Sequence, residues 1–91
     1  MIARATIVVT GIVQGVYYRY NTKCKADEMS LRGTVRNLPD GAVRIVCEGE
    51  KADILKLIAW CRQGPRGAYV ERADVEWETP TGVFSKFSVM Y

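Results

Sequence analysis

The sequence contains no histidine, and among its 91 residues it has only three cysteines and three prolines. Without histidine, the chain has neither a histidine general base nor the histidine ligands of a zinc site, so we exclude both. The three cysteines form no Cys-x-x-Cys pair, and each lies within the apolar pattern of an expected helix or strand: Cys24, Cys47 and Cys61. We therefore interpret them as small buried hydrophobic residues, in preference to metal ligands or a disulfide framework.

Long apolar runs are absent as well. No segment approaches the length that crosses a bilayer, and the first residues lack the basic, apolar, small-residue order of a secretory signal. These absences predict a soluble, cytoplasmic protein without a membrane partner. The net charge of +3 is small and the basic residues are dispersed, which favours solvated side chains over a nucleic-acid surface, so we expect no nucleic acid partner.

The composition that remains is typical of one globular domain. Apolar residues make up 48% of the chain and charged residues 25%, with no sign of disorder. A chain of this length buries one core and is too short for two. We therefore expect a single domain over residues 1–91, without repeats or linkers.

The apolar residues follow the periods of strands and helices in turn. They predict strands at residues 2–10, 33–37, 42–48, 69–77 and 83–90 and helices at residues 20–30 and 50–62. Gly49 is expected to end a strand and Gly64 to cap the second helix, while residues 38–41 and 79–82 are expected turns between consecutive strands. Two helices on one face of a mostly antiparallel sheet of four to five strands make an α+β, ferredoxin-like sandwich.

Residues 11–19 join the first strand to the first helix and read Gly-Ile-Val-Gln-Gly-Val-Tyr-Tyr-Arg. Gly15 permits backbone conformations in which successive N–H groups point at one anion, and the N-terminus of the following helix favours the same ligand. Arg19 adds a planar cation suited to phosphate oxygens. The loop therefore indicates a phosphate site, although a short glycine loop with a nearby arginine is more often an ordinary turn.

Asn37 ends the strand that leads into the expected hairpin. From its position alone it is a turn-forming asparagine that bonds to its own backbone. In the functional interpretation, its amide holds a water against a group bound beside Arg19. The expected topology allows the loop and the hairpin to lie at the same end of the sheet.

These two segments resemble the signatures of a known family. Residues 11–19 (G-x-V-Q-G-V-x-x-R) and residues 33–43 (G-x-V-R-N-x-x-x-G-x-V), followed by Gly49, are similar to the two signatures of the acylphosphatases. The resemblance continues through residues 60–65 (Trp-Cys-Arg-Gln-Gly-Pro) to the last strand, so it covers essentially the whole chain.

The resemblance implies a small cytoplasmic enzyme that hydrolyses the carboxyl-phosphate bond of acyl phosphates without metal or cofactor. Carried over by position, Arg19 binds the phosphoryl group and Asn37 orients the attacking water. The implied phosphate-binding loop consists of Gln14, Gly15, Val16, Tyr17 and Tyr18. We expect the protein to act as a monomer on a small-molecule acyl phosphate.

The chemistry of the residues agrees with that substrate class. The two signatures supply an arginine and backbone N–H groups but no histidine, metal cluster or paired carboxylates. Such a site suits a leaving group that departs without a proton, and a carboxylate, whose acid has a pKa of about 4, is one. Since an asparagine is not a base, the proton of the water is expected to pass to the substrate's own phosphate oxygen.

The chain departs from the family pattern at Tyr18, where phenylalanine or methionine is usual, and at Thr34, where an aromatic residue is usual. Neither change removes a proposed catalytic group, so we expect them to affect rate and substrate preference more than the reaction. Tyr17 and Tyr18 are the two aromatic residues whose loop position is suited to placing one ring over the acyl group.

Two other functions remain open from the residues alone. A ferredoxin-like fold also serves binding modules, in which the loop would hold a phosphate-bearing ligand without hydrolysing it. An RNA-binding sheet is a third interpretation, but residues 33–37 and 42–47 contain no aromatic residue on which a base would stack.

Overall fold

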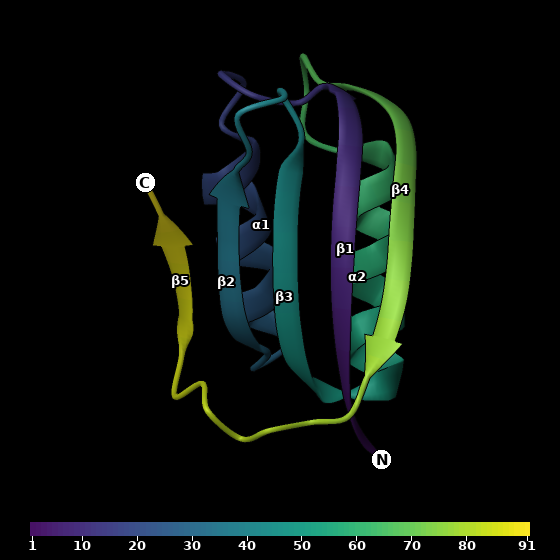
Figure 1. Cartoon of the computed structure of the whole chain (residues 1–91), viewed down its shortest axis with the longest axis vertical. Coiled ribbons are helices and arrows are strands. Elements are labelled where there is room, and N and C mark those ends of the chain that lie inside the picture. Colours follow the sequence, from purple (N-terminus) through teal and green to yellow (C-terminus); the bar gives the residue numbers. More distant parts are fainter.

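The structure is a computed structural model that describes residues 1–91, with five strands and two helices in the order expected (Figure 1). The elements are β1 (Ile2–Ile12), α1 (Tyr18–Glu28), β2 (Arg32–Asn37), β3 (Val43–Glu50), α2 (Lys51–Gln63), β4 (Tyr69–Glu78) and β5 (Phe87–Met90). Neither helix is long and apolar enough to span a membrane.

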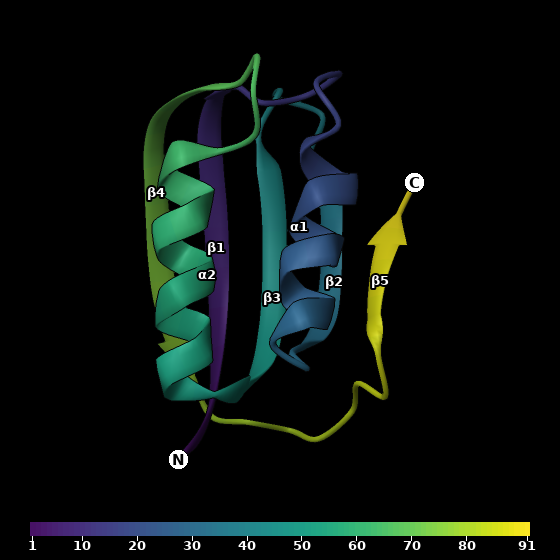
Figure 2. The ribbon, with the colours of Figure 1, turned by 180° about the vertical axis from the view of Figure 1, so that it is seen from behind.

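The five strands form one sheet in the order β4-β1-β3-β2-β5. Every neighbouring pair is antiparallel except β2 and β5, which run parallel. Both helices cover the same face of the sheet (Figure 2). The prediction of an α+β sandwich with two helices on one face of a mostly antiparallel sheet is therefore confirmed.

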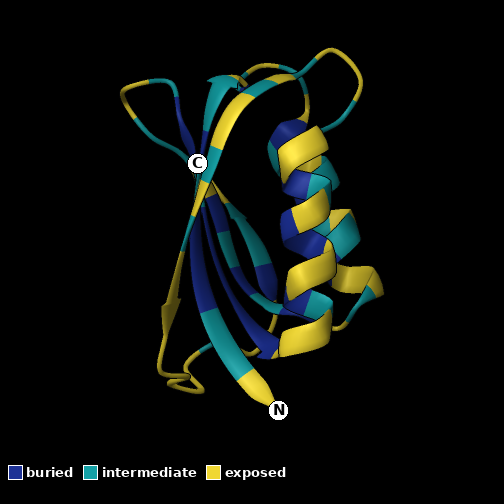
Figure 3. Ribbon diagram, turned by 90° about the vertical axis from the view of Figure 1, so that its right-hand side faces the viewer, coloured by how far each residue is buried: buried dark blue, intermediate teal, exposed yellow.

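The core lies between the helices and the covered face of the sheet. Alternate residues of β1, namely Ala5, Ile7 and Val9, are fully buried there, as expected for a strand covered on one side. α2 meets them with a stripe at helical spacing: Ile54, Leu57, Ile58 and Cys61. Figure 3 shows the resulting division, with buried residues on the inner side of the helices and exposed residues on the outer side.

The prediction for the last strand was wrong in its connection and its length. Residues 79–82 were expected to form a turn that joins the last two strands along the chain, but β4 and β5 lie at opposite edges of the sheet. The intervening chain crosses one end of the sheet, and only Phe87–Met90 is a strand (Figure 1). The final segment pairs in parallel with the edge of β2, while β4 pairs only with β1.

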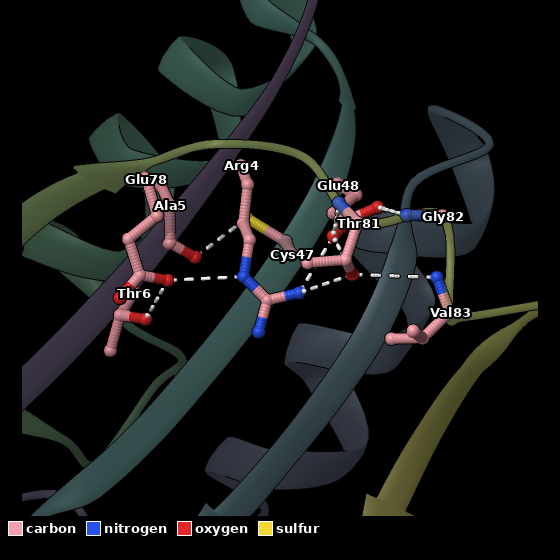
Figure 4. Close-up of polar contacts among 9 residues, drawn as sticks. All are labelled: Arg4, Ala5, Thr6, Cys47, Glu48, Glu78, Thr81, Gly82 and Val83. Carbon is pink, nitrogen blue, oxygen red and sulfur yellow. Dashed lines mark hydrogen bonds and ion pairs between the residues drawn. The ribbon is translucent and has the colours of Figure 1, made fainter.

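A buried carboxylate fixes this crossing segment. Glu48 of β3 is 2% exposed and accepts hydrogen bonds from the backbone N–H groups of Thr81 and Gly82, each at 2.9 Å (Figure 4). Arg4 of β1 forms an ion pair with Glu48 at 2.6 Å and with Glu78 at 3.0 Å. Burial opposes ionisation of Glu48, but these hydrogen bonds outweigh it and lower its pKa to about 2.

Several element ends also differ from the prediction. α1 begins at Tyr18, two residues earlier than expected, so Arg19 lies within its first turn. β1 continues past Thr10 to Ile12 through an irregularity in its pairing with β4. Gly49 does not end its strand, which continues to Glu50.

The cysteines follow the prediction in two cases of three. Cys47 and Cys61 are fully buried, and burial raises the pKa of each thiol to about 12. Cys24 is exposed on α1, so its assignment as a buried residue was wrong. Its position between the buried Thr22 and Ala26 places it on the outer side of the helix.

Candidate phosphate site

The N-terminus of α1 lacks the residues that usually stabilise the start of a helix. It has no side-chain cap and no acidic residue in its first turn, where acidic side chains normally complement the positive end of the helix dipole. Instead, Arg19 adds a second positive charge to this turn. An anion bound between them would offset these positive charges, so the local sequence is suited to an anion.

The loop before the helix presents unpaired backbone donors. Gly15 has φ of 75°, and no atom lies within 4 Å of where its Cβ would be, so the glycine is required by conformation and not by packing. Tyr17 adopts a left-handed conformation with φ of 60° directly before the helix. No backbone N–H from Gln14 to Tyr17 donates to another group in the protein.

Gln14 connects this loop by hydrogen bonds to the hairpin between β2 and β3. Its Nε2 donates to the carbonyl oxygens of Leu38 and Ala42, each at 2.8 Å. The loop and the hairpin consequently lie at the same end of the sheet, as Figures 1 and 2 show from opposite sides. This brings the end of β2, and with it Asn37, next to the start of α1.

Arg19 is held by the C-terminal end of the chain. Its Nη1 donates to the carbonyl oxygen of Met90 at 2.9 Å, and its guanidinium lies 4.8 Å from the centre of the Tyr91 ring. The parallel pairing of β5 with β2 places Met90 opposite Arg36, the residue before Asn37. The last strand therefore orients the arginine toward the end of β2.

Asn37 carries an unsatisfied polar atom. Its Oδ1 is buried and has no hydrogen-bond partner, although buried amide oxygens nearly always have one. A group that donates a hydrogen bond would satisfy it. An unsatisfied acceptor at this position is what an asparagine that binds a water or a ligand requires.

A cavity of about 420 Å³ joins these features. Its wall includes both predicted catalytic residues and contains no carboxylate side chain: Val13, Gly15, Tyr17, Tyr18, Arg19, Tyr20, Asn37, Val89 and Tyr91. Of the predicted loop residues, Gln14 and Val16 lie outside the wall. Across residues 1–91, no three Cys, Asp or Glu side chains gather in an arrangement that could hold a metal ion.

The two tyrosines of the loop point in different directions. Tyr17 is 80% exposed, whereas Tyr18 is 1% exposed. The Tyr18 hydroxyl donates to the carbonyl oxygen of Cys61 at 2.7 Å, and its ring centre lies 5.4 Å from that of Trp60. Burial raises the pKa of Tyr18 well above its ordinary value. Of the two rings, only that of Tyr17 is free to lie over an acyl group.

Sequence reasoning missed the residues that the C-terminal end contributes to the wall, namely Val89 and Tyr91, and also Tyr20 of α1. Tyr20 could have been predicted, because it directly follows Arg19 in the sequence. No local pattern indicates the contribution of β5, because it depends on pairing with a strand about 50 residues earlier in the chain.

Comparison with known proteins identifies the family. The acylphosphatase family model matches residues 5–89. The chain is 45% identical to an acylphosphatase of Roseiflexus sp. (strain RS-1) over 89 residues, which cover 98% of this chain and 96% of that protein. It is 44% identical to an acylphosphatase of Chloroflexus aurantiacus over 90 residues, 99% of this chain and 98% of that protein.

A solved structure agrees. The crystal structure of acylphosphatase from Bacillus subtilis superposes with a TM-score of 0.94 at 31% identity, covering all of both chains. The family model, the relatives and the solved structure thus agree on one enzyme class, the acylphosphatases, which are hydrolases. The chain belongs to the acylphosphatase family.

Proposed function

We propose that Arg19 and the backbone N–H groups of the loop bind the phosphoryl group of a small acyl phosphate, that Asn37 orients the attacking water, and that hydrolysis needs no metal or cofactor. The single observation that carries this proposal is the cavity that joins Arg19, Gly15 and Asn37 at one end of the sheet. The family gives the reaction, and this arrangement suggests how the residues divide it.

The phosphoryl group would be bound by charge and by backbone donors. Phosphoryl transfer depends mainly on positioning and on stabilising the charge of the transferring oxygens. The planar guanidinium of Arg19 has several N–H donors for phosphate oxygens. One of its nitrogens, Nη1, donates a hydrogen bond to the carbonyl oxygen of Met90, which fixes the orientation of the group. The free N–H groups from Gln14 to Tyr17 and the N-terminus of α1 supply the remaining donors.

The attacking water would be held by Asn37. Its buried Oδ1 lacks a partner and is suited to accept a hydrogen bond from water. A water with one O–H donated to Asn37 keeps an oxygen lone pair free for attack on phosphorus. Because the amide does not accept a proton, Asn37 positions the water and does not act as a base.

The reaction balances without an acid from the enzyme. The water oxygen forms a bond to phosphorus as the bond from phosphorus to the acyl oxygen breaks, and the carboxylate leaves with that electron pair. A proton of the water passes to a phosphoryl oxygen, so the products are carboxylate and inorganic phosphate. The leaving carboxylate needs no proton, since its acid has a pKa of about 4.

The test is hydrolysis of a synthetic acyl phosphate in excess chelator by wild type, Arg19→Ala and Asn37→Ala. Arg62→Ala is the matched control, because Arg62 is an exposed arginine of α2 outside the cavity wall. We expect wild type and Arg62→Ala to turn over equally and the other two variants to lose at least about a hundredfold in rate while remaining folded. Turnover that needs added metal, or that survives both site substitutions, would contradict the proposal.

A further inference from the structure

We propose that Tyr18 is a positioning residue for phosphate, through the hydrogen bond from its hydroxyl to the carbonyl oxygen of Cys61 at the end of α2. This inference rests on the proposed function, since it assumes that the loop binds phosphate. It assigns a role to the buried hydroxyl of Tyr18, which the proposed function does not use.

The geometry of Tyr18 joins two helix ends. Tyr18 is the first residue of α1 and directly precedes Arg19, while Cys61 lies in the last turn of α2. The carbonyl groups of a last helical turn have no partner within the helix. The 2.7 Å bond from the Tyr18 hydroxyl satisfies one of them and connects the start of the phosphate site to α2.

The packing around Tyr18 leaves its side chain little freedom. The side chain is 1% exposed, and the Trp60 ring packs against it at a tilt of 46°. A Cβ on Gly64 would lie 3.2 Å from its Cε2, so the chain after α2 approaches the ring closely. A ring confined in this way and bonded at its tip fixes the backbone from which it projects.

The loop needs such a constraint because its conformation is unfavourable on its own. Tyr17 has φ of 60° without being glycine, a strained conformation that persists only where neighbouring structure enforces it. Gln14 restrains the loop from the hairpin side. Tyr18 restrains it on the opposite side of Tyr17, so the strained residue lies between two attachments.

A loop that is ordered before the ligand arrives binds more tightly, because binding does not have to supply the ordering energy. The hydroxyl should therefore affect phosphate and substrate by the same factor. Loss of uniform binding raises KM and leaves kcat unchanged. A purely structural hydroxyl would lower the melting temperature without changing the affinity of the folded enzyme.

The experiment compares Tyr18→Phe with Thr6→Val by steady-state kinetics, with inorganic phosphate as the competitive inhibitor, well below the melting temperature. Thr6 is the control, since it is also buried and its hydroxyl also donates a hydrogen bond, to Glu78 Oε1 at 3.1 Å, but it lies on β1 outside the cavity wall. We expect Tyr18→Phe to raise KM and the phosphate inhibition constant about fivefold each, the factor set by one net hydrogen bond of about 1 kcal/mol. Thr6→Val should lower the melting temperature and change neither constant.

Other results would overturn the inference. An unchanged inhibition constant in Tyr18→Phe, or an equal rise in both variants, would make the hydroxyl a matter of stability alone. Should Tyr18→Phe fail to fold, Tyr18→Met also removes the hydroxyl and fills the site with a flexible apolar side chain; an unchanged inhibition constant in this variant would likewise contradict the inference. Failure of the proposed function is distinguished by Arg19→Ala, which would then bind phosphate as wild type does.

Discussion

Arg19 and Met90 are joined by a 2.9 Å hydrogen bond from the guanidinium Nη1 to the backbone carbonyl, across 71 residues of sequence. The bond links the first turn of α1 to the end of β5, and the Tyr91 ring lies against the same guanidinium. The C-terminal strand and Tyr91 therefore contribute to the candidate phosphate site together with the loop.

We predict that Tyr91→Ala weakens phosphate binding without destabilising the protein. The ring is 4.8 Å from the guanidinium carbon, and an exposed contact of this kind contributes about 0.5–1 kcal/mol, or roughly a twofold to fivefold change in the inhibition constant. Tyr69→Ala is the control, because Tyr69 is exposed on β4 outside the cavity wall. Equal inhibition constants in the two variants would show that the ring does not orient Arg19.

Gly15→Ala is predicted to reduce activity more than stability. At φ of 75° a side chain is strained, yet nothing lies near the added Cβ, so the cost in unfolding free energy is only about 1 kcal/mol. In the variant, we expect the loop to relieve this strain by a shift of its backbone N–H groups. Because these groups are the proposed phosphate donors, kcat/KM should fall. Gly82→Ala is the control: its φ is 71° with the same open space, but it lies in the crossing segment. Equal activity in both variants would contradict a phosphate-binding role for the loop backbone.

Tyr17→Ala is predicted to change substrate preference. Of the two loop tyrosines, Tyr17 is the exposed one, and it lines the cavity. Its ring is therefore available to contact an acyl group, whereas the proposed phosphate contacts do not involve it. We expect KM to rise about threefold to tenfold for an aromatic acyl phosphate, the scale of one ring contact, and to change little for acetyl phosphate. Parallel changes for both substrates would show instead that Tyr17 acts on the phosphate loop.

Acid is predicted to destabilise the protein through Glu48. Its pKa is about 2 in the folded chain and near 4.5 when unfolded, so its ionised form contributes stability above pH 4.5. That contribution is lost as the pH falls from 4.5 toward 2. Glu48→Gln should flatten this part of the stability profile and, by breaking a buried ion pair, cost about 3 kcal/mol at neutral pH.

The measurement for Glu48 is chemical denaturation between pH 2 and pH 7. Glu50→Gln is the control, because Glu50 is exposed and pairs only with the N-terminal amine. A Glu48→Gln profile with the slope of wild type would show that other carboxylates carry the acid sensitivity.

The sequence predicted most of the sheet because alternation is a local signal. The apolar residues of β1 alternate, and Ala5, Ile7 and Val9 are buried as that pattern predicts. In β3, residues 45–49 are all buried, and the Leu-Pro-Asp-Gly turn places β2 beside β3. β5 could not be placed in the same way, since it has only four residues and pairs in parallel with a distant strand. The segment that leads to it is bonded to Glu48, a buried charge that the hydrophobic pattern does not indicate.

Only some features of the candidate site could be predicted from the sequence. Arg19, Gly15 and Asn37 share the cavity wall as expected from the two motifs. The different directions of Tyr17 and Tyr18 were not predictable, because they depend on the left-handed conformation of Tyr17 at the start of the helix. The contribution of Tyr91 was not predictable either, since it follows from the placement of β5.

The central claim is that Arg19 binds the phosphoryl group and Asn37 orients the water, and kcat measured together with the phosphate inhibition constant tests it most directly. We predict that Asn37→Ala retains a near-normal inhibition constant and loses kcat by at least about a hundredfold, whereas Arg19→Ala loses phosphate binding as well. An Asn37→Ala enzyme that turns over at the rate of wild type, or an Arg19→Ala enzyme that binds phosphate normally, would contradict it.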